Sequence, residues 1–183
     1  MNIPNRLTLL RVLMVPAFVV VLLLPSVSDW LALALFALAG LTDLLDGAIA
    51  RKKNMVTDFG KLMDPLADKL MLTAALVCFT YAGLVHPAVT IIVISRELLV
   101  TGLRTLAISK GKVIAADFWG KLKTVAQDVT IIVILVWQSC PASAFGGFCR
   151  VLSVLCIWAM LVLTVISAIH YCIVNKEVFQ NAK

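Results

Sequence analysis

Six apolar runs separated by short polar stretches fill most of this 183-residue chain and constrain its fold more than any other feature. They lie at approximately 7–25, 30–50, 61–82, 87–108, 120–138 and 151–174. Each is close to the roughly 20 residues that a helix needs to cross a bilayer. Only 14% of the residues are charged, against about a quarter in an average soluble domain. We therefore expect an all-α, polytopic membrane protein: a single transmembrane domain over residues 1–183, folded as a six-transmembrane-helix bundle.

The distribution of basic residues predicts how this bundle is oriented. Loops rich in lysine and arginine stay in the cytoplasm, and here nearly all basic residues fall on one set of loops and helix ends, whereas the opposite side carries only Arg150. The basic set is Arg6, Arg11, Arg51, Lys52, Lys53, Lys61, Lys110, Lys112, Lys121, Lys123, Lys176 and Lys183. Both termini should then be cytoplasmic, as an even number of spans requires. The sequence does not indicate a soluble fold with a basic face and interleaved aromatic residues, so we expect no nucleic-acid partner.

The cysteine and histidine spacings argue against a zinc site. No CxxC occurs, and neither His86 nor His170 has a partner at ligand spacing. Cys140 and Cys149 fall in the same predicted outer loop. A disulfide between them in an oxidising compartment stays an open alternative.

Four carboxylates, Asp43, Asp46, Asp64 and Asp68, stand out against the apolar background. Each costs about 2.5–3.5 kcal/mol at the centre of a bilayer, so a counter-charge must accompany them. Helical spacing puts them in two stripes, which are Asp43, Asp46, Gly47, Ala50 and Arg51 on the second predicted span, and Gly60, Asp64 and Asp68 on the third. Oxygen ligands without His or Cys favour Mg²⁺, Mn²⁺ or Ca²⁺ over zinc.

These acids have two other interpretations. They could form salt bridges at the helix ends with Arg51, Lys61 and Lys69, but four acids in two stripes with glycines in register make this improbable. They could also line the cation or proton pathway of a small transporter. A conduit would spread ionisable groups through the membrane depth, whereas these acids cluster at the predicted cytoplasmic ends of two helices.

The segments "DLLDGAIAR" and "GKLMDPLAD" together resemble the signature of the CDP-alcohol phosphatidyltransferases, D-x-x-D-G-x-x-A-R, eight residues, then G-x-x-x-D-x-x-x-D. Every position of that signature is filled. "NIPNRLTLLR", "SRELLVTGLR" and "GKLKT" are most similar to the phosphatidylglycerophosphate synthase branch. The resemblance implies transfer of a phosphatidyl group from CDP-diacylglycerol to sn-glycerol 3-phosphate with release of CMP. It also implies a homodimer of six-helix subunits, and we expect a bacterial cytoplasmic (inner) membrane protein with a cytoplasmic active site.

The resemblance assigns roles residue by residue. Asp43, Asp46, Asp64 and Asp68 would hold a pair of divalent cations, Mg²⁺ or Mn²⁺, and Asp68 would be the catalytic base. The residues expected to bind CDP-diacylglycerol are Asp43, Gly47, Ala50, Arg51, Gly60 and Asp64.

The acceptor site has to be predicted from charge, since glycerol 3-phosphate is a dianion. Its candidate residues are Arg11, Arg96, Arg104, Lys121 and Lys123. An arginine within a span faces the bundle and not lipid. One alternative stays open, in which Arg96 or Arg104 pairs with Glu97 or Asp128 for purely structural reasons. The acceptor could also be inositol phosphate, serine or phosphatidylglycerol, although the basic set favours a phosphorylated one.

Overall fold

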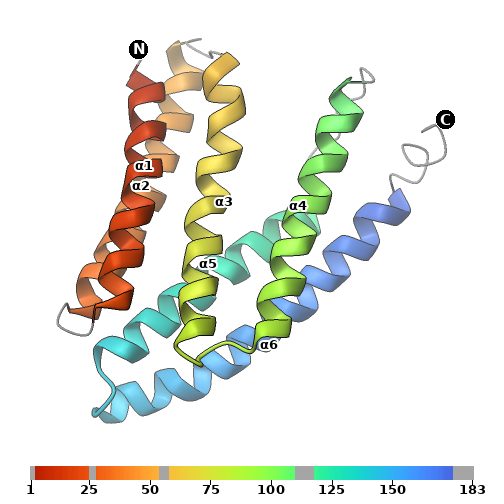
Figure 1. Cartoon of the computed structure of the whole chain (residues 1–183). Coiled ribbons are helices and arrows are strands. Elements are labelled where there is room, and N and C mark those ends of the chain that lie inside the picture. The colour runs from red at the N-terminus through yellow and green to blue at the C-terminus, as the bar shows by residue number, and fades with distance from the viewer. Residues whose placement is uncertain (1–2, 25–27, 54–57, 110–117, 175–183) are drawn as a thin grey trace.

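The computed structural model describes residues 3–24, 28–53, 58–109 and 118–174, and within these ranges the chain forms six α-helices and no strand (Figure 1). The helices are α1 (Ile3–Leu23), α2 (Asp29–Lys53), α3 (Asp58–Tyr81), α4 (Pro87–Ser109), α5 (Phe118–Ser139) and α6 (Ala144–Val174). Within them, side chains are not described for residues 3–7, 43–53, 58–68, 106, 108 and 109. The all-α prediction is confirmed for the described residues.

The start of α6 differs most from the sequence-based expectation. The expected span began at residue 151, because Gly146 and Gly147 were interpreted as part of a loop; the helix begins at Ala144. Ser143 explains the difference, since its Oγ accepts a hydrogen bond from the Gly146 N–H at 2.9 Å and so caps the helix N-terminus. Gly146 is required for close packing, because a Cβ there would collide with the backbone carbonyl of Cys140.

The turn between α3 and α4 places these two helices in antiparallel order. At the end of α3, Gly83 has a φ of 73°. The Leu84 N–H bonds to the Phe79 carbonyl at 2.9 Å, and the Gly83 N–H bonds to the Thr80 carbonyl at 3.1 Å. This is the hydrogen-bond pattern of a Schellman motif, in which a glycine adopts the left-handed conformation at no steric cost. The turn sends α4 back alongside α3.

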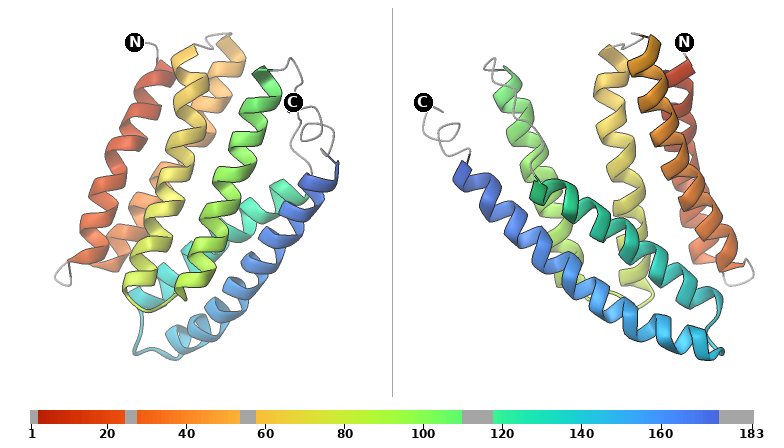
Figure 2. Two further views of the ribbon diagram at one scale, coloured as in Figure 1. Left: turned by 45° about the vertical axis from the view of Figure 1, so that its right-hand side comes forward. Right: turned by 180° about the vertical axis from the view of Figure 1, so that it is seen from behind.

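The helices form two groups that lean apart towards one end of the molecule. Helix α1 packs against α2 and α3, while α6 packs against α5 and α4, and α5 also contacts α2 and α3. Figure 2 shows α5 and α6 side by side, slanting across the direction of α1, α2 and α3. The start of α1 lies on the same side as the ends of α2, α4 and α6 (Figure 1).

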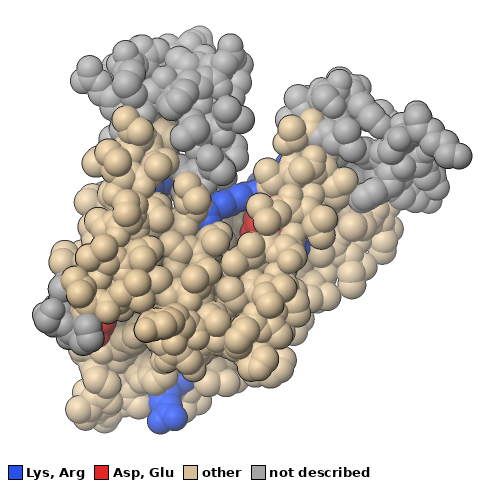
Figure 3. Space-filling view, in the orientation of Figure 1, with Lys and Arg blue, Asp and Glu red and all other residues tan. Residues whose placement is uncertain are grey.

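Apolar side chains both fill the interior and cover much of the outside. Phe18, Ala75 and Ile134 are fully buried where the two groups meet. Large apolar side chains such as Leu99 and Trp158 are more than 60% exposed, at 67% and 61%. Figure 3 shows that charged atoms are sparse on the visible outer surface. Such a surface suits contact with lipid hydrocarbon.

Helix α6 is the one helix, among the residues described, that is long and apolar enough to cross a membrane. Shorter apolar stretches occur in α1, α2 and α3, at Thr8–Leu23, Asp29–Thr42 and Lys69–Tyr81.

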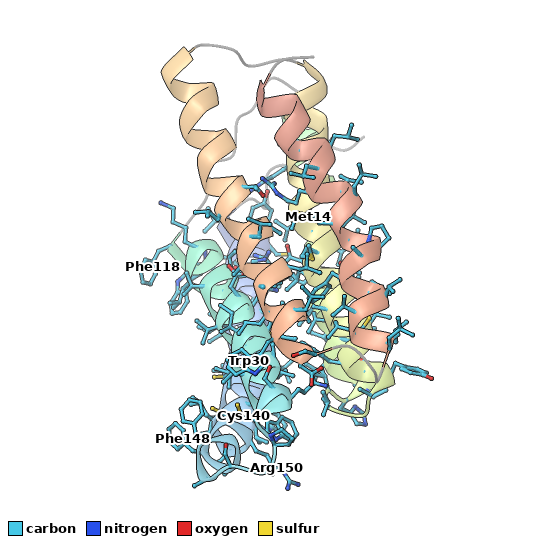
Figure 4. All side chains as sticks on the ribbon, turned by 90° about the vertical axis from the view of Figure 1, so that its left-hand side faces the viewer. Met14, Trp30, Phe118, Cys140, Phe148 and Arg150 are labelled. Atoms are coloured by element: carbon cyan, nitrogen blue, oxygen red, sulfur yellow. The ribbon has the colours of Figure 1, made fainter. Side chains whose placement is uncertain are left out.

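The end of the molecule opposite the start of α1 carries the predicted outer loop. Figure 4 shows Cys140, Phe148 and Arg150 gathered there, with Trp30 nearby. The Arg150 guanidinium lies 5.8 Å from the centre of the Trp137 ring, a cation–π contact. Cys140 and Cys149 are both free thiols, so the structure contains no disulfide between them.

Candidate active site: a cationic cavity beside the aspartate helices

The eight signature residues lie where α2 ends and α3 begins. Asp43, Asp46, Gly47, Ala50 and Arg51 belong to α2, and Gly60, Asp64 and Asp68 belong to α3. Their side chains lie outside the described residues, so their assignment to metal and CDP-diacylglycerol stays a prediction. The backbone does put both stripes on consecutive helices that end and begin on the same side of the molecule (Figure 1).

A cavity of about 770 Å³ begins directly beside these stripes. On α2 its lining includes Leu41, two residues before Asp43, and on α3 it includes Lys69, the residue after Asp68. Residues of α1, α4 and α5 complete the wall. Figure 3 shows a hollow between the two parts of the molecule, with lysine or arginine and acidic atoms visible inside it.

All five residues predicted for the acceptor site line this one cavity: Arg11 of α1, Arg96 and Arg104 of α4, and Lys121 and Lys123 of α5. Arg11 is 2% exposed and Lys123 is 5% exposed, whereas Lys121 is exposed to solvent. These residues come from three helices and are up to 112 positions apart in the sequence, from 11 to 123. Their assignment to glycerol 3-phosphate is not tested by this arrangement and stays a prediction.

Glu97 is the buried acid of the cavity wall. Its Oε1 accepts a short hydrogen bond from Lys123 Nζ and longer ones from Arg96 Nη1 and Gln127 Nε2, both at 3.4 Å. Its Oε2 lies 3.9 Å from Lys69 Nζ. Lysine, arginine and glutamate are tolerated inside a membrane protein when they pair with one another in this way.

Arg96 has the structural contacts that the open alternative required. Its Nη1 pairs with Glu97, and its Nη2 donates a hydrogen bond of 2.6 Å to Ser167 Oγ on α6. Arg96 therefore anchors α4 to α6 as well as lining the cavity. Arg104 differs, because its buried Nε has no hydrogen-bond partner in the described part of the chain.

The described part of the cavity lining carries a surplus of positive charge. Among its described residues, six are basic, Arg11, Lys69, Arg96, Arg104, Lys121 and Lys123, and two are acidic, Glu97 and Asp128. Guanidinium and ammonium groups bind phosphate through charge-assisted hydrogen bonds. Low-dielectric walls increase the attraction for an anion. The cavity is thus chemically suited to a small phosphorylated molecule.

Several residues of this site were missed or undervalued in the sequence analysis. Lys69 was considered only as a salt-bridge partner of the aspartates, and Thr101 and Gln127 were not considered. Thr101 Oγ1 donates to the Glu97 carbonyl at 2.7 Å and accepts a hydrogen bond from Lys69 Nζ. The i, i+4 spacings of Glu97 with Thr101 and of Lys123 with Gln127 were the available signal, because such pairs share a helix face.

Comparison with known proteins places the chain in a family. Residues 1–168 match the CDP-alcohol phosphatidyltransferase family. The chain belongs to that family of membrane-bound enzymes.

Its curated relatives are similar over most of their length. A Bacillus subtilis protein named CDP-diacylglycerol–glycerol-3-phosphate 3-phosphatidyltransferase is 36% identical, over 99% of this chain and 98% of the relative. An Escherichia coli K12 protein of the same name is 38% identical, over 87% of this chain and 91% of the relative. A Mycobacterium tuberculosis protein named probable phosphatidylglycerophosphate synthase is 39% identical, over 93% of this chain and 79% of the relative.

Proposed function

We propose that this protein transfers the phosphatidyl group of CDP-diacylglycerol to sn-glycerol 3-phosphate, producing phosphatidylglycerophosphate and CMP. The observation that carries the proposal is the convergence of Arg11, Arg96, Arg104, Lys121 and Lys123 on one cavity beside the aspartate helices. The family membership supplies the donor chemistry. The names of relatives that cover most of the chain supply the acceptor.

The donor would bind at the signature residues. Asp43, Gly47, Ala50, Arg51, Gly60 and Asp64 would form the CDP-diacylglycerol site. Asp43, Asp46, Asp64 and Asp68 would hold two divalent cations, Mg²⁺ or Mn²⁺, because a ligand set made only of carboxylates suits hard cations. Bound there, the cations would neutralise negative charge on the diphosphate and on the departing CMP.

The acceptor would bind in the cavity with its phosphate among the basic side chains. Asp68 would then accept the proton of the acceptor hydroxyl as that oxygen attacks the phosphorus of the phosphatidyl group. A new P–O bond forms, and the P–O bond to CMP breaks. The proposal is supported by the chain order, since Lys69 lines the cavity and Asp68 precedes it.

In the membrane, the six helices would form the predicted bundle with both termini in the cytoplasm, as a homodimer in a bacterial inner membrane. Three observations support the bundle and its orientation, whereas the homodimer and the bacterial inner membrane rest on the family resemblance. The helix ends that carry the predicted cytoplasmic loops lie on one side (Figure 1). Arg150 lies at the other end (Figure 4). The outer surface is largely apolar.

The alternative acceptors can be ranked by the charge of the cavity. A surplus of basic groups favours a phosphorylated acceptor such as glycerol phosphate or inositol phosphate over serine. The relatives' names favour glycerol 3-phosphate.

The test is an acceptor panel with purified protein in detergent, CDP-diacylglycerol and Mg²⁺. CMP release is followed with glycerol 3-phosphate, myo-inositol phosphate, serine or no acceptor. Release with glycerol 3-phosphate alone is the expected result. CMP release with a different acceptor would assign the cavity to that acceptor. The absence of CMP release under every condition would leave the phosphatidyltransferase proposal without support.

A further inference from the structure

Glu97 contacts more partners than one counter-charge would require. Its side chain is 9% exposed and meets Lys123, Arg96, Gln127 and Lys69. These partners come from α3, α4 and α5, so one carboxylate joins three helices of the cavity wall. All four partners also line the cavity.

The cations around Glu97 could not keep this arrangement without it. Lys123 and Arg96 are 6% and 8% exposed in their side chains, so each repels the other in a region of low dielectric. A lysine is also a flexible point charge on a four-carbon stem, and holding it in one rotamer costs entropy. A shared carboxylate offsets the repulsion and restricts the rotamer before any ligand arrives.

We propose that Glu97 is a positioning residue for the acceptor: it holds Lys123, against the charges of the neighbouring Arg96 and Lys69, in the place where Lys123 receives the acceptor's phosphate. The inference rests on the proposed function, because it requires the cavity to bind the acceptor. Glu97 itself does not touch the substrate in this account. It acts through Lys123, its shortest contact.

The test compares steady-state kinetics of the wild type with Glu97→Gln, Glu97→Asp, Lys123→Met and the double variant Glu97→Gln/Lys123→Met. The control is Asp29→Asn, which removes a carboxylate at the start of α2, outside the cavity. KM is measured separately for glycerol 3-phosphate and for CDP-diacylglycerol, together with kcat and the thermal midpoint in detergent. Asp29→Asn should leave both KM values unchanged.

Glu97→Gln keeps the shape and one acceptor oxygen but removes the charge. We expect it to raise KM for glycerol 3-phosphate about 10-fold or more, with KM for CDP-diacylglycerol unchanged. Glu97→Asp should recover part of the loss, because it restores the charge. The double variant should be no worse than Lys123→Met, since a residue that acts through Lys123 has no effect once Lys123 is gone.

The outcomes separate the inference from the function on which it rests. If Lys123→Met leaves KM for glycerol 3-phosphate unchanged, the proposed acceptor site is wrong. If Lys123→Met raises that KM but Glu97→Gln does not, or if the two effects multiply in the double variant, the positioning role is wrong. A lower thermal midpoint with an unchanged ratio of the two KM values would also overturn it.

A neutral variant covers the case in which Glu97→Gln does not fold. Gln127→Leu removes the hydrogen bond that Gln127 Nε2 donates to Glu97 Oε1 and the one that Gln127 Oε1 accepts from Lys123 Nζ, without changing any charge. It should raise KM for glycerol 3-phosphate about 2- to 10-fold, because the two hydrogen bonds are long, at 3.4 and 3.3 Å, and each contributes little. An unchanged KM in a folded Gln127→Leu protein would count against the inference.

Discussion

Replacing Arg104 tests the acceptor cavity with the least disturbance to the fold. Arg104 is half-buried, lines the cavity, and its Nε has no hydrogen-bond partner in the described part of the chain. Arg104→Met keeps most of the apolar stem and removes the guanidinium. Because no described side chain depends on that Nε, the variant should fold with an unchanged or slightly higher thermal midpoint.

The magnitude follows from the interaction that is lost. A hydrogen bond to a charged group contributes about 1.5–3 kcal/mol. Since each 1.4 kcal/mol is about a factor of ten in affinity, KM for glycerol 3-phosphate should rise about 10- to 150-fold. Arg104→Lys keeps the charge but loses the planar fork, so its KM should fall between those of the wild type and Arg104→Met.

The assay measures initial CMP release over a matrix of both substrate concentrations. Thr105→Ala is the matched control, because Thr105 is the exposed neighbour on α4 and does not line the cavity. A rise confined to KM for glycerol 3-phosphate supports the acceptor site. An equal rise in both KM values would assign Arg104 to a shared region, and no rise would remove it from the site.

Two further predictions concern the signature and the buried pair. Asp64→Asn and Asp68→Asn should each abolish transfer while the circular dichroism and detergent elution stay those of the wild type; an active, metal-independent Asp64→Asn protein would refute the metal assignment. Arg96→Met should lower stability by about 1–3 kcal/mol, because it removes the hydrogen bond to Ser167 and one of the cations beside Glu97, which keeps Lys123 and Lys69 as partners. Thermal denaturation in detergent measures this, and an unchanged midpoint would contradict the structural role of Arg96.

The helices of this protein could be predicted from the sequence because each long apolar run corresponds to one helix. The expected run at 87–108 matches α4 (Pro87–Ser109) closely. The start of α6 was wrong by seven residues, from 151 to 144. There the Ser143 cap determines the helix start, and the adjacent glycines gave a misleading signal.

The candidate site was only partly predictable, for a different reason. The signature aspartates lie close together in the sequence, so helical spacing alone predicts that they share helix faces. The partners of Glu97 are not local, since Lys69 and Lys123 lie 28 and 26 residues away. Only the packing of α3, α4 and α5 brings them together. Sequence analysis therefore gave Arg96 and Lys123 as candidates and Glu97 as an alternative partner of Arg96, but it did not connect Glu97 with Lys69 or Lys123.

We propose a metal-dependent phosphatidyl transfer that uses both the aspartate signature and the cationic cavity. Its most direct test follows radiolabelled glycerol 3-phosphate into lipid, together with CMP release, in the purified protein with and without a chelator. We expect one labelled lipid for each CMP, loss of both products on chelation, and recovery with Mg²⁺ or Mn²⁺. CMP release without labelled lipid, or transfer that survives complete chelation, would contradict it.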